Sequence, residues 1–205
     1  MALIINIRGT GGSGKSFIVH CLIKKLGSKR SIKRYISGEG YRVGNDGGRV
    51  VGYRVGGDVL IVGRYDTDCG GCDQIHTQDE ICNRVKAFAE KGKVVIFEGL
   101  LISGLYSRYL NLSRELQRKG HQFLWAFLDT SLEKCLKRTV KRRLARGNIK
   151  PLNPIHTTNK YRAVELAKEH ALHDGEKVIT LRSGGAHKQL LKIVKKKLYG
   201  RRSTH

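Results

Sequence analysis

The apolar residues of this chain gather in short runs, which alternate with longer amphipathic segments. The short runs carry almost no polar side chains, which is typical of strands buried on both faces of a sheet. They span residues 2–8, 94–97, 123–128 and 178–181. The segments between them place apolar residues three or four apart, a spacing that predicts helices. The alternation predicts an α/β fold, a mainly parallel sheet flanked by helices.

The predicted helices have recognisable starts and ends. Thr77 stands three residues before Glu80, and Thr130 three before Glu133, so each threonine is expected to cap a helix. A loop with two prolines follows Gly147, and we expect the next helix to begin only at about residue 159. The predicted helices cover residues 16–26, 77–90, 104–118, 130–146, 159–173 and 187–198.

Residues 36–65 follow a different pattern. Three β-rich runs, Tyr41–Val43, Arg49–Val55 and Val59–Val62, are separated by turns rich in Gly and Asp. This pattern indicates a hairpin or meander. We therefore predict one domain over residues 1–205, with an antiparallel β insertion at about 36–65 and a helical lid at about 131–156.

The loop after the first predicted strand carries the strongest chemical signal. Gly9-Thr-Gly-Gly-Ser-Gly-Lys-Ser16 matches the phosphate-binding motif G-x-x-x-x-G-K-[ST] between a buried strand and a helix. Its glycines let backbone N–H groups turn inward on a phosphate, to which the helix dipole adds. Lys15 is expected to reach the β- and γ-phosphates of ATP and Ser16 to bind Mg²⁺. The predicted ATP ligands are Gly9, Gly11, Gly12, Ser13, Gly14, Lys15, Ser16, Phe17 and Arg138.

Phosphoryl transfer also needs carboxylates. Glu98 ends a predicted buried strand, where open α/β sheets place their ligands, so we predict that it shares the metal with Ser16. A base for an acceptor hydroxyl is expected in the Gly- and Asp-rich segment after Val62. Asp66 comes first after the strand and is the preferred candidate, with Asp73 second.

The predicted lid is strongly basic. Arg138, Arg142 and Arg146 are four residues apart, so they share one helix face from which they can neutralise a transferring phosphoryl group. Arg142 and Arg146 are the preferred catalytic candidates.

Charge extends this picture to a polyanionic partner. The chain has 40 Lys and Arg against 17 Asp and Glu, a formal net charge of +23. Residues 101–205 hold 24 of those basic residues and only 7 acidic ones, and no acidic residue follows Glu176. Such a field suits nucleic acid, although it can also be a solvated surface. Tyr41, Tyr53 and Tyr65 are candidates to stack on a base, or else pack in the sheet.

Other features narrow the cellular context. No apolar run reaches the length of about 20 residues that spans a bilayer, and the N-terminus lacks a secretory signal, so we predict a cytoplasmic protein without membrane contact. The five cysteines are odd in number and do not suggest a disulfide framework. Cys69 and Cys72 form a lone CxxC pair, which we interpret as a tight glycine turn in preference to a zinc site.

These motifs resemble the P-loop kinase superfamily, including nucleoside monophosphate and polynucleotide kinases. The phosphate loop, Phe97-Glu98-Gly99 and the arginines up to Gly147 carry the resemblance. The run from Val62 to Asp73, Val-Gly-Arg-Tyr-Asp-Thr-Asp-Cys-Gly-Gly-Cys-Asp, is similar to the bacteriophage kinases of 5-hydroxymethyluracil in DNA. That resemblance implies ATP-dependent phosphorylation of a base hydroxymethyl group in DNA, with the base extruded from a duplex. The alternatives are a kinase of free nucleosides or nucleotides and a nucleic-acid-binding P-loop ATPase.

Overall fold

In the computed structural model, residues 1–34, 41–43, 49–66 and 70–200 are described. One eight-stranded sheet runs through these residues in the order β3-β2-β4-β5-β6-β1-β7-β8. The five strands from β5 to β8 in this order pair in parallel, and β2, β3 and β4 extend the sheet with antiparallel pairs. The strands are β1 (Leu3–Arg8), β2 (Lys29–Arg34), β3 (Tyr41–Val43), β4 (Arg49–Val55), β5 (Val59–Val62), β6 (Val94–Glu98), β7 (Gln122–Asp129) and β8 (Val178–Arg182).

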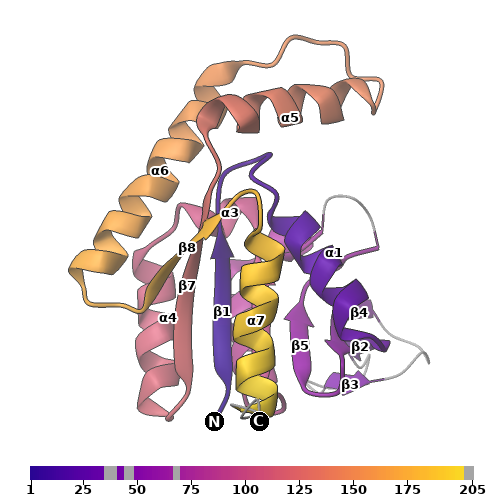
Figure 1. Cartoon of the computed structure of the whole chain (residues 1–205), viewed down its shortest axis with the longest axis vertical. Helices are drawn as coiled ribbons and strands as arrows, with labels where there is room; N and C mark the ends of the chain where they lie inside the picture. Colours follow the sequence, from indigo (N-terminus) through magenta and orange to yellow (C-terminus); the bar gives the residue numbers. More distant parts are fainter. Residues whose placement is uncertain (35–40, 44–48, 67–69, 201–205) are drawn as a thin grey trace, which may run out of the picture.

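Helices cover both faces of this sheet, so the predicted fold class is confirmed (Figure 1). Apolar residues of α1 and α7 pack on one face, and those of α2, α4 and α6 pack on the other. Among the described residues, no helix combines the length and apolar character that crossing a bilayer requires. The helices are α1 (Lys15–Leu26), the 3₁₀ turn η1 (Cys72–Gln74), α2 (Gln78–Ala89), α3 (Leu100–Ser103), α4 (Ser107–Arg118), α5 (Leu132–Leu144), α6 (Pro154–His173) and α7 (Ala186–Tyr199).

Several element boundaries differ from the predictions. The β2 strand was not predicted, because Lys-Arg-Ser-Ile-Lys-Arg has only one apolar residue. It pairs between β3 and β4 near the sheet edge. The antiparallel strands therefore begin at Lys29 and end at Val55, while Val59–Val62 pairs in parallel with β6 and belongs to the core. The helix predicted over 104–118 begins at Ser107 as α4, and the four-residue helix α3, which was not predicted, precedes it.

Two predicted helix starts were also wrong. Ser131, not Thr130, caps α5, since the Ser131 hydroxyl accepts from the Lys134 amide at 3.4 Å. The Thr130 hydroxyl instead donates to the Ser13 carbonyl at 3.1 Å. The α6 helix begins at Pro154, because proline is favoured in the first turn of a helix. The Thr77 cap is confirmed, its hydroxyl accepting from the Glu80 amide at 3.1 Å.

The α5 helix crosses above the carboxyl ends of the parallel strands, and the chain returns through α6 along one side of the sheet (Figure 1). The phosphate loop emerges between β1 and α1 at that same edge. The lid helix and the phosphate loop therefore face one another across the end of the sheet.

Candidate active site

The phosphate loop is held open by glycine geometry. Gly12 and Gly14 have φ of 80° and 104°, a region that side chains with a Cβ rarely adopt. A Cβ on Gly12 would also stand 2.4 Å from the Cys135 carbonyl oxygen of α5, so the lid can approach only because this side chain is absent. Lys15 is buried, and its Nζ donates to the carbonyl oxygens of Gly9 at 2.5 Å and Thr10 at 3.2 Å.

A buried carboxylate lies against the end of this loop. Glu98 ends β6, and its Oε1 accepts from the Ser16 hydroxyl at 2.9 Å and from the Tyr65 hydroxyl at 3.2 Å. Burial raises the pKa of Glu98 to about 7, and the positive charge of Lys15 keeps it from rising further. Burial in turn lowers the pKa of Lys15, an effect that the negative charge of Glu98 opposes. A hydroxyl and a carboxylate beside a phosphate cradle are oxygen ligands of the kind Mg²⁺ prefers.

A second carboxylate, that of Asp73 in η1, lines one cavity together with Glu98 and the phosphate loop. The Asp73 oxygens accept from the Leu100 amide at 2.7 and 2.9 Å and from the Leu101 amide at 3.1 Å. These are the first amides of α3, so Asp73 caps that helix and its carboxylate is held in place. The cavity has a volume of about 310 Å³. Its lining includes Thr10, Gly11, Gly12, Gly14, Lys15, Ser16, Phe17, Gly70, Asp73, Glu98, Leu100, Arg138 and Arg142.

Asp66, the preferred base from sequence, lies elsewhere. Its carboxylate is exposed, pairs with the Arg64 guanidinium and is not among the lining residues of the cavity. The hydrogen bond from Arg64 lowers the pKa of Asp66. Arg64 and Gly71 also exchange backbone hydrogen bonds, Gly71 N to Arg64 O measuring 2.8 Å. This pairing closes the segment between them into a loop that includes Asp66, and the chain beyond it returns Asp73 to the site.

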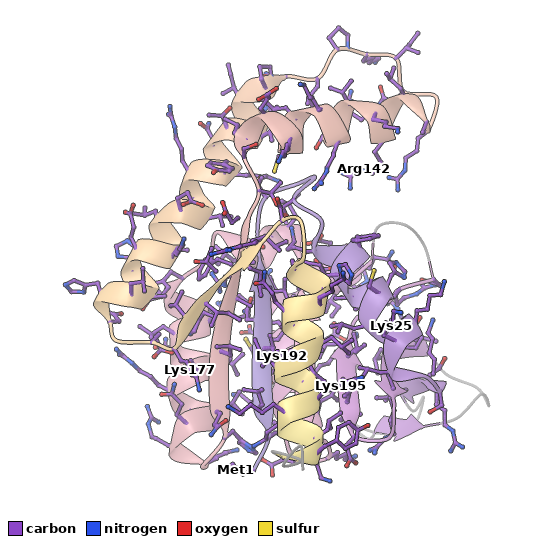
Figure 2. All side chains as sticks on the ribbon, in the orientation of Figure 1. Met1, Lys25, Arg142, Lys177, Lys192 and Lys195 are labelled. Carbon is purple, nitrogen blue, oxygen red and sulfur yellow. The ribbon has the colours of Figure 1, made fainter. Side chains whose placement is uncertain are left out.

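The lid arginines occupy different places. The Arg138 Nη1 donates to the carbonyl oxygens of Gly12 and Ser13, both at 3.3 Å. Arg142 lines the cavity and lies on the side of α5 that faces the sheet (Figure 2). Arg146 follows the end of α5, is exposed and is not among the lining residues of this cavity.

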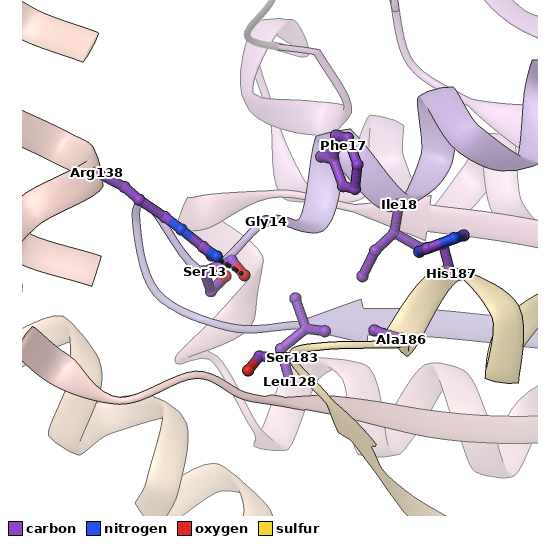
Figure 3. Close-up of a pocket in the computed structure, with 9 residues that line it drawn as sticks. All are labelled: Ser13, Gly14, Phe17, Ile18, Leu128, Arg138, Ser183, Ala186 and His187. Atoms are coloured by element: carbon purple, nitrogen blue, oxygen red, sulfur yellow. Dashed lines mark hydrogen bonds between the residues drawn. The ribbon is translucent and has the colours of Figure 1, made fainter. Parts of the chain in front are cut away.

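A second cavity, of about 350 Å³, continues from the phosphate loop toward α7 (Figure 3). Phe17 and Ile18 of α1 face Leu128 and His187 across it, and the Phe17 ring meets the His187 ring edge-on with centroids 6.1 Å apart. Apolar and aromatic walls beside a phosphate site suit a nucleotide base. The remaining lining residues are Ser13, Gly14, Arg138, Ser183 and Ala186.

The sequence did not indicate a role in the site for Ile18, Leu128 or His187. It also did not predict the contact of Tyr65 with Glu98. Ser13, Gly14, Phe17 and Arg138, which also line this cavity, were among the predicted ATP ligands. Tyr53 and Tyr65 are each 3% exposed and therefore pack in the core, where no base can stack on them. Trp125 is fully buried. Tyr41 has no described side chain, and Cys69 lies outside the described residues; within those residues, no three His, Cys, Asp or Glu side chains cluster as metal ligands would.

Comparison with known proteins identifies relatives over most of the chain. A 5-hmdU DNA kinase of Pseudomonas phage PaMx11 is 34% identical over 164 residues, which cover 78% of this chain and 79% of that protein. Kinases of the same name from Pseudomonas phage M6 and Delftia phage PhiW-14 are 32% and 29% identical; they cover 85% and 84% of this chain, and the matches span 88% and 65% of those proteins.

No protein-family model matches the chain. A solved structure from the PezAT toxin–antitoxin system of Streptococcus pneumoniae aligns over 98% of this chain and 79% of its own, with a TM-score of 0.49 and 13% identity. A likeness this weak supports no inference about function. The match to the PaMx11 protein confirms the predicted resemblance, and the chain belongs to the family of phage 5-hmdU DNA kinases.

Proposed function

We propose that the protein transfers the γ-phosphoryl group of ATP to the hydroxymethyl group of 5-hydroxymethyluracil in DNA, in the cytoplasm of the infected host cell. One observation carries this proposal beyond family membership. Lys15 of the phosphate loop and the carboxylate of Asp73 line a single cavity, so a phosphoryl donor and an alcohol acceptor can meet there.

Each group of residues has a separate role in the transfer. The loop amides and Lys15 hold the β- and γ-phosphates, and Arg138 and Arg142 offset the negative charge that spreads over the transferring group. Ser16 and Glu98 hold Mg²⁺, which when bound neutralises phosphate charge. Phe17, Leu128 and His187 enclose the adenine. Of the two arginines that the sequence favoured, Arg142 fits this role best, because it lines the cavity whereas Arg146 is not among the lining residues.

Asp73 is the base in this proposal, in place of Asp66. Its carboxylate accepts a hydrogen bond from the substrate hydroxyl and takes the proton as the hydroxyl oxygen bonds to the γ-phosphorus. The bond from that phosphorus to the β,γ-bridging oxygen breaks, and ADP leaves with the electron pair. Asp73 suits this task because α3 fixes it at the cavity, whereas Asp66 pairs with Arg64 outside the cavity lining.

The acceptor is a base within a duplex, and it must leave the base stack to reach Asp73. Extrusion costs a few kcal/mol, least where the base is modified or mispaired. Contacts to many phosphates can offset that cost, and a chain with a net charge of +23 can supply them.

A transfer assay tests the proposal. Radiolabelled ATP and Mg²⁺ are supplied with a duplex containing 5-hydroxymethyluracil, an unmodified duplex, or free nucleosides and nucleotides. Label should move to the modified duplex alone. Transfer only to monomers would show a nucleoside kinase instead, and DNA-stimulated phosphate release without a labelled acceptor would show an ATPase.

The same assay separates the two aspartates. Asp73→Asn should lower kcat for the modified duplex by about 10²-fold or more, since a general base contributes about 10²–10⁴-fold. Its ATP affinity, measured by calorimetry, should change little. Asp66→Asn is the matched control and should stay within a few-fold of the wild type. The reverse result would return the role of base to Asp66.

A further inference from the structure

Outside the basic lid helix α5, two surfaces of this chain are rich in Lys and Arg, and a duplex in reach of Asp73 cannot lie equally against both. One surface is α7, where Lys188, Lys192, Lys195 and Lys196 are exposed; Figure 2 labels Lys192 and Lys195 on it. The other is the antiparallel extension formed by β2, β3 and β4. Residues 29–55, which contain it, hold seven Lys and Arg against two acidic residues.

The two surfaces lie on different sides of the site, one on the side of the ATP donor and the other on the side of the acceptor. His187 at the start of α7 lines the cavity that suits the adenine, so α7 lies on the donor side of the phosphate loop. The extension lies on the acceptor side. The Arg49 Nη1 at the start of β4 is 3.5 Å from the His76 Nε2, and His76 stands three residues after Asp73. The start of β4 thus lies beside the segment that carries the proposed base.

The register of the extension places like charges opposite one another. Arg30 of β2 pairs with Arg54 of β4. Like charges directly across a sheet destabilise it. Arg30 is exposed, and within the described residues no carboxylate pairs with Arg30 or Arg49. This pair of like charges gains stability when a phosphate lies against it.

Protection of the sheet edge does not explain this arrangement. Lysine and arginine on an outermost strand prevent pairing with another chain. Here β3 is the outermost strand, whereas Arg30 and Arg54 lie on β2 and β4 inside the sheet. The Arg54 guanidinium also donates to the carbonyl oxygens of Gly57 at 2.9 Å and Lys91 at 3.3 Å, which fixes its charge on the side of the sheet that faces α2.

We propose that the β2–β4 extension is the docking surface for the DNA backbone, with Arg49 near the target nucleotide and Arg30 and Arg54 farther along the duplex. The five steps along β4 from Arg49 to Arg54 rise by about 17 Å, comparable to the axial rise of about five base pairs. This inference rests on the proposed function, because it takes DNA as the substrate and Asp73 as the acceptor end of the site.

Two double variants of equal charge change test it. Arg30→Gln/Arg49→Gln alters the extension, and Lys192→Gln/Lys195→Gln alters α7. Binding of a 20-base-pair duplex containing 5-hydroxymethyluracil is measured from 50 to 300 mM salt. The extension variant should lose about 1.8 from its log–log salt slope, which is about 0.9 for each lost phosphate contact, and should show a raised KM for DNA. The α7 variant should keep the wild-type slope.

Equal losses in the two variants, or a loss confined to the α7 variant, would overturn the proposal. Calorimetric binding of ATP confirms that each variant is folded, and Arg30→Lys/Arg49→Lys, which keeps the charge, should retain the slope. Failure of the proposed function is distinguishable from failure of this surface. A wild type that transfers no label to the modified duplex refutes the function, while a difference in slope between the two variants still locates the DNA.

Discussion

The buried carboxylate of Glu98 gives a stability prediction whose sign and size both follow from its surroundings. Its pKa is about 7 in the folded protein against an ordinary value of 4.5. The folded state therefore binds more protons than the unfolded state between these pH values. The contribution of Glu98 to stability is full below pH 4.5 and is lost as pH rises through 7. Between pH 5 and pH 8 this loss amounts to about 2 to 3 kcal/mol.

Glu98→Gln removes the titrating group while keeping its size and an oxygen that can accept from Ser16 and Tyr65. The free energy of unfolding of wild type and variant is measured by urea titration at pH 5 and pH 8, without nucleotide. From pH 5 to pH 8, the free energy of unfolding of the variant should rise by about 2 to 3 kcal/mol relative to that of the wild type. The loss of the attraction between the ionised Glu98 and Lys15 reduces this gain.

Asp66→Asn provides the control for this measurement. The Asp66 carboxylate is exposed and its pKa is lowered by Arg64, so it is already ionised at pH 5 and its removal should leave no pH-dependent difference above that value. A stability difference for Glu98→Gln that is flat from pH 5 to pH 8, or that grows in favour of the wild type, would refute the assignment of a raised pKa to Glu98.

Three further substitutions test other parts of the site. Lys15→Ala should abolish detectable transfer of label, while duplex affinity in a salt titration stays within about twofold, since Lys15 is buried in the phosphate loop. Tyr65→Phe deletes the hydroxyl that donates to Glu98. It should raise several-fold the Mg²⁺ concentration that half-saturates nucleotide binding in calorimetry, and an unchanged value would mean that Tyr65 has no part in holding Glu98. Arg138→Ala removes donors to Gly12 and Ser13 and should lower kcat by about 10²-fold with a smaller rise in KM for ATP; a change in KM alone would contradict a role in the transition state.

The sequence predicted the parts of the fold that local pattern determines. The buried strands and the phosphate loop carry their own signals, since an apolar run or a glycine spacing leaves few alternatives. The β2 strand does not, because one isoleucine among basic residues becomes a strand only through its neighbours in the sheet. Pro154 was interpreted as part of a loop although it stands in the first turn of α6, where its missing N–H costs nothing.

The choice between two aspartates shows why site geometry was harder to predict. Asp66 is nearer to β5 along the chain, and proximity to a strand end was the only guide that sequence offered. The backbone pairing of Arg64 with Gly71 turns the chain back, so that Asp73 lines the cavity and Asp66 does not. A Cβ on Gly71 would lie 2.5 Å from the Glu98 Oε1, so a glycine there lets the returning chain pass close to the Glu98 carboxylate. Such contacts join residues far apart in sequence, and no local pattern announces them.

The short helix α3 determines how far apart donor and acceptor stand. At its start, the Leu100 and Leu101 amides hold Asp73. At its end, the Ser103 hydroxyl accepts from the Gly9 amide at 3.3 Å, where the phosphate loop begins. The four residues of α3 thus set the spacing between Asp73 and the phosphate loop. A hydroxyl carried on an arm one methylene shorter or longer would not reach the position between Asp73 and the γ-phosphate. One residue inserted into α3 would turn its first amides by about 100° away from Asp73. In the proposed transfer we therefore expect selectivity for a hydroxymethyl arm over a shorter or longer one to depend on the length of α3.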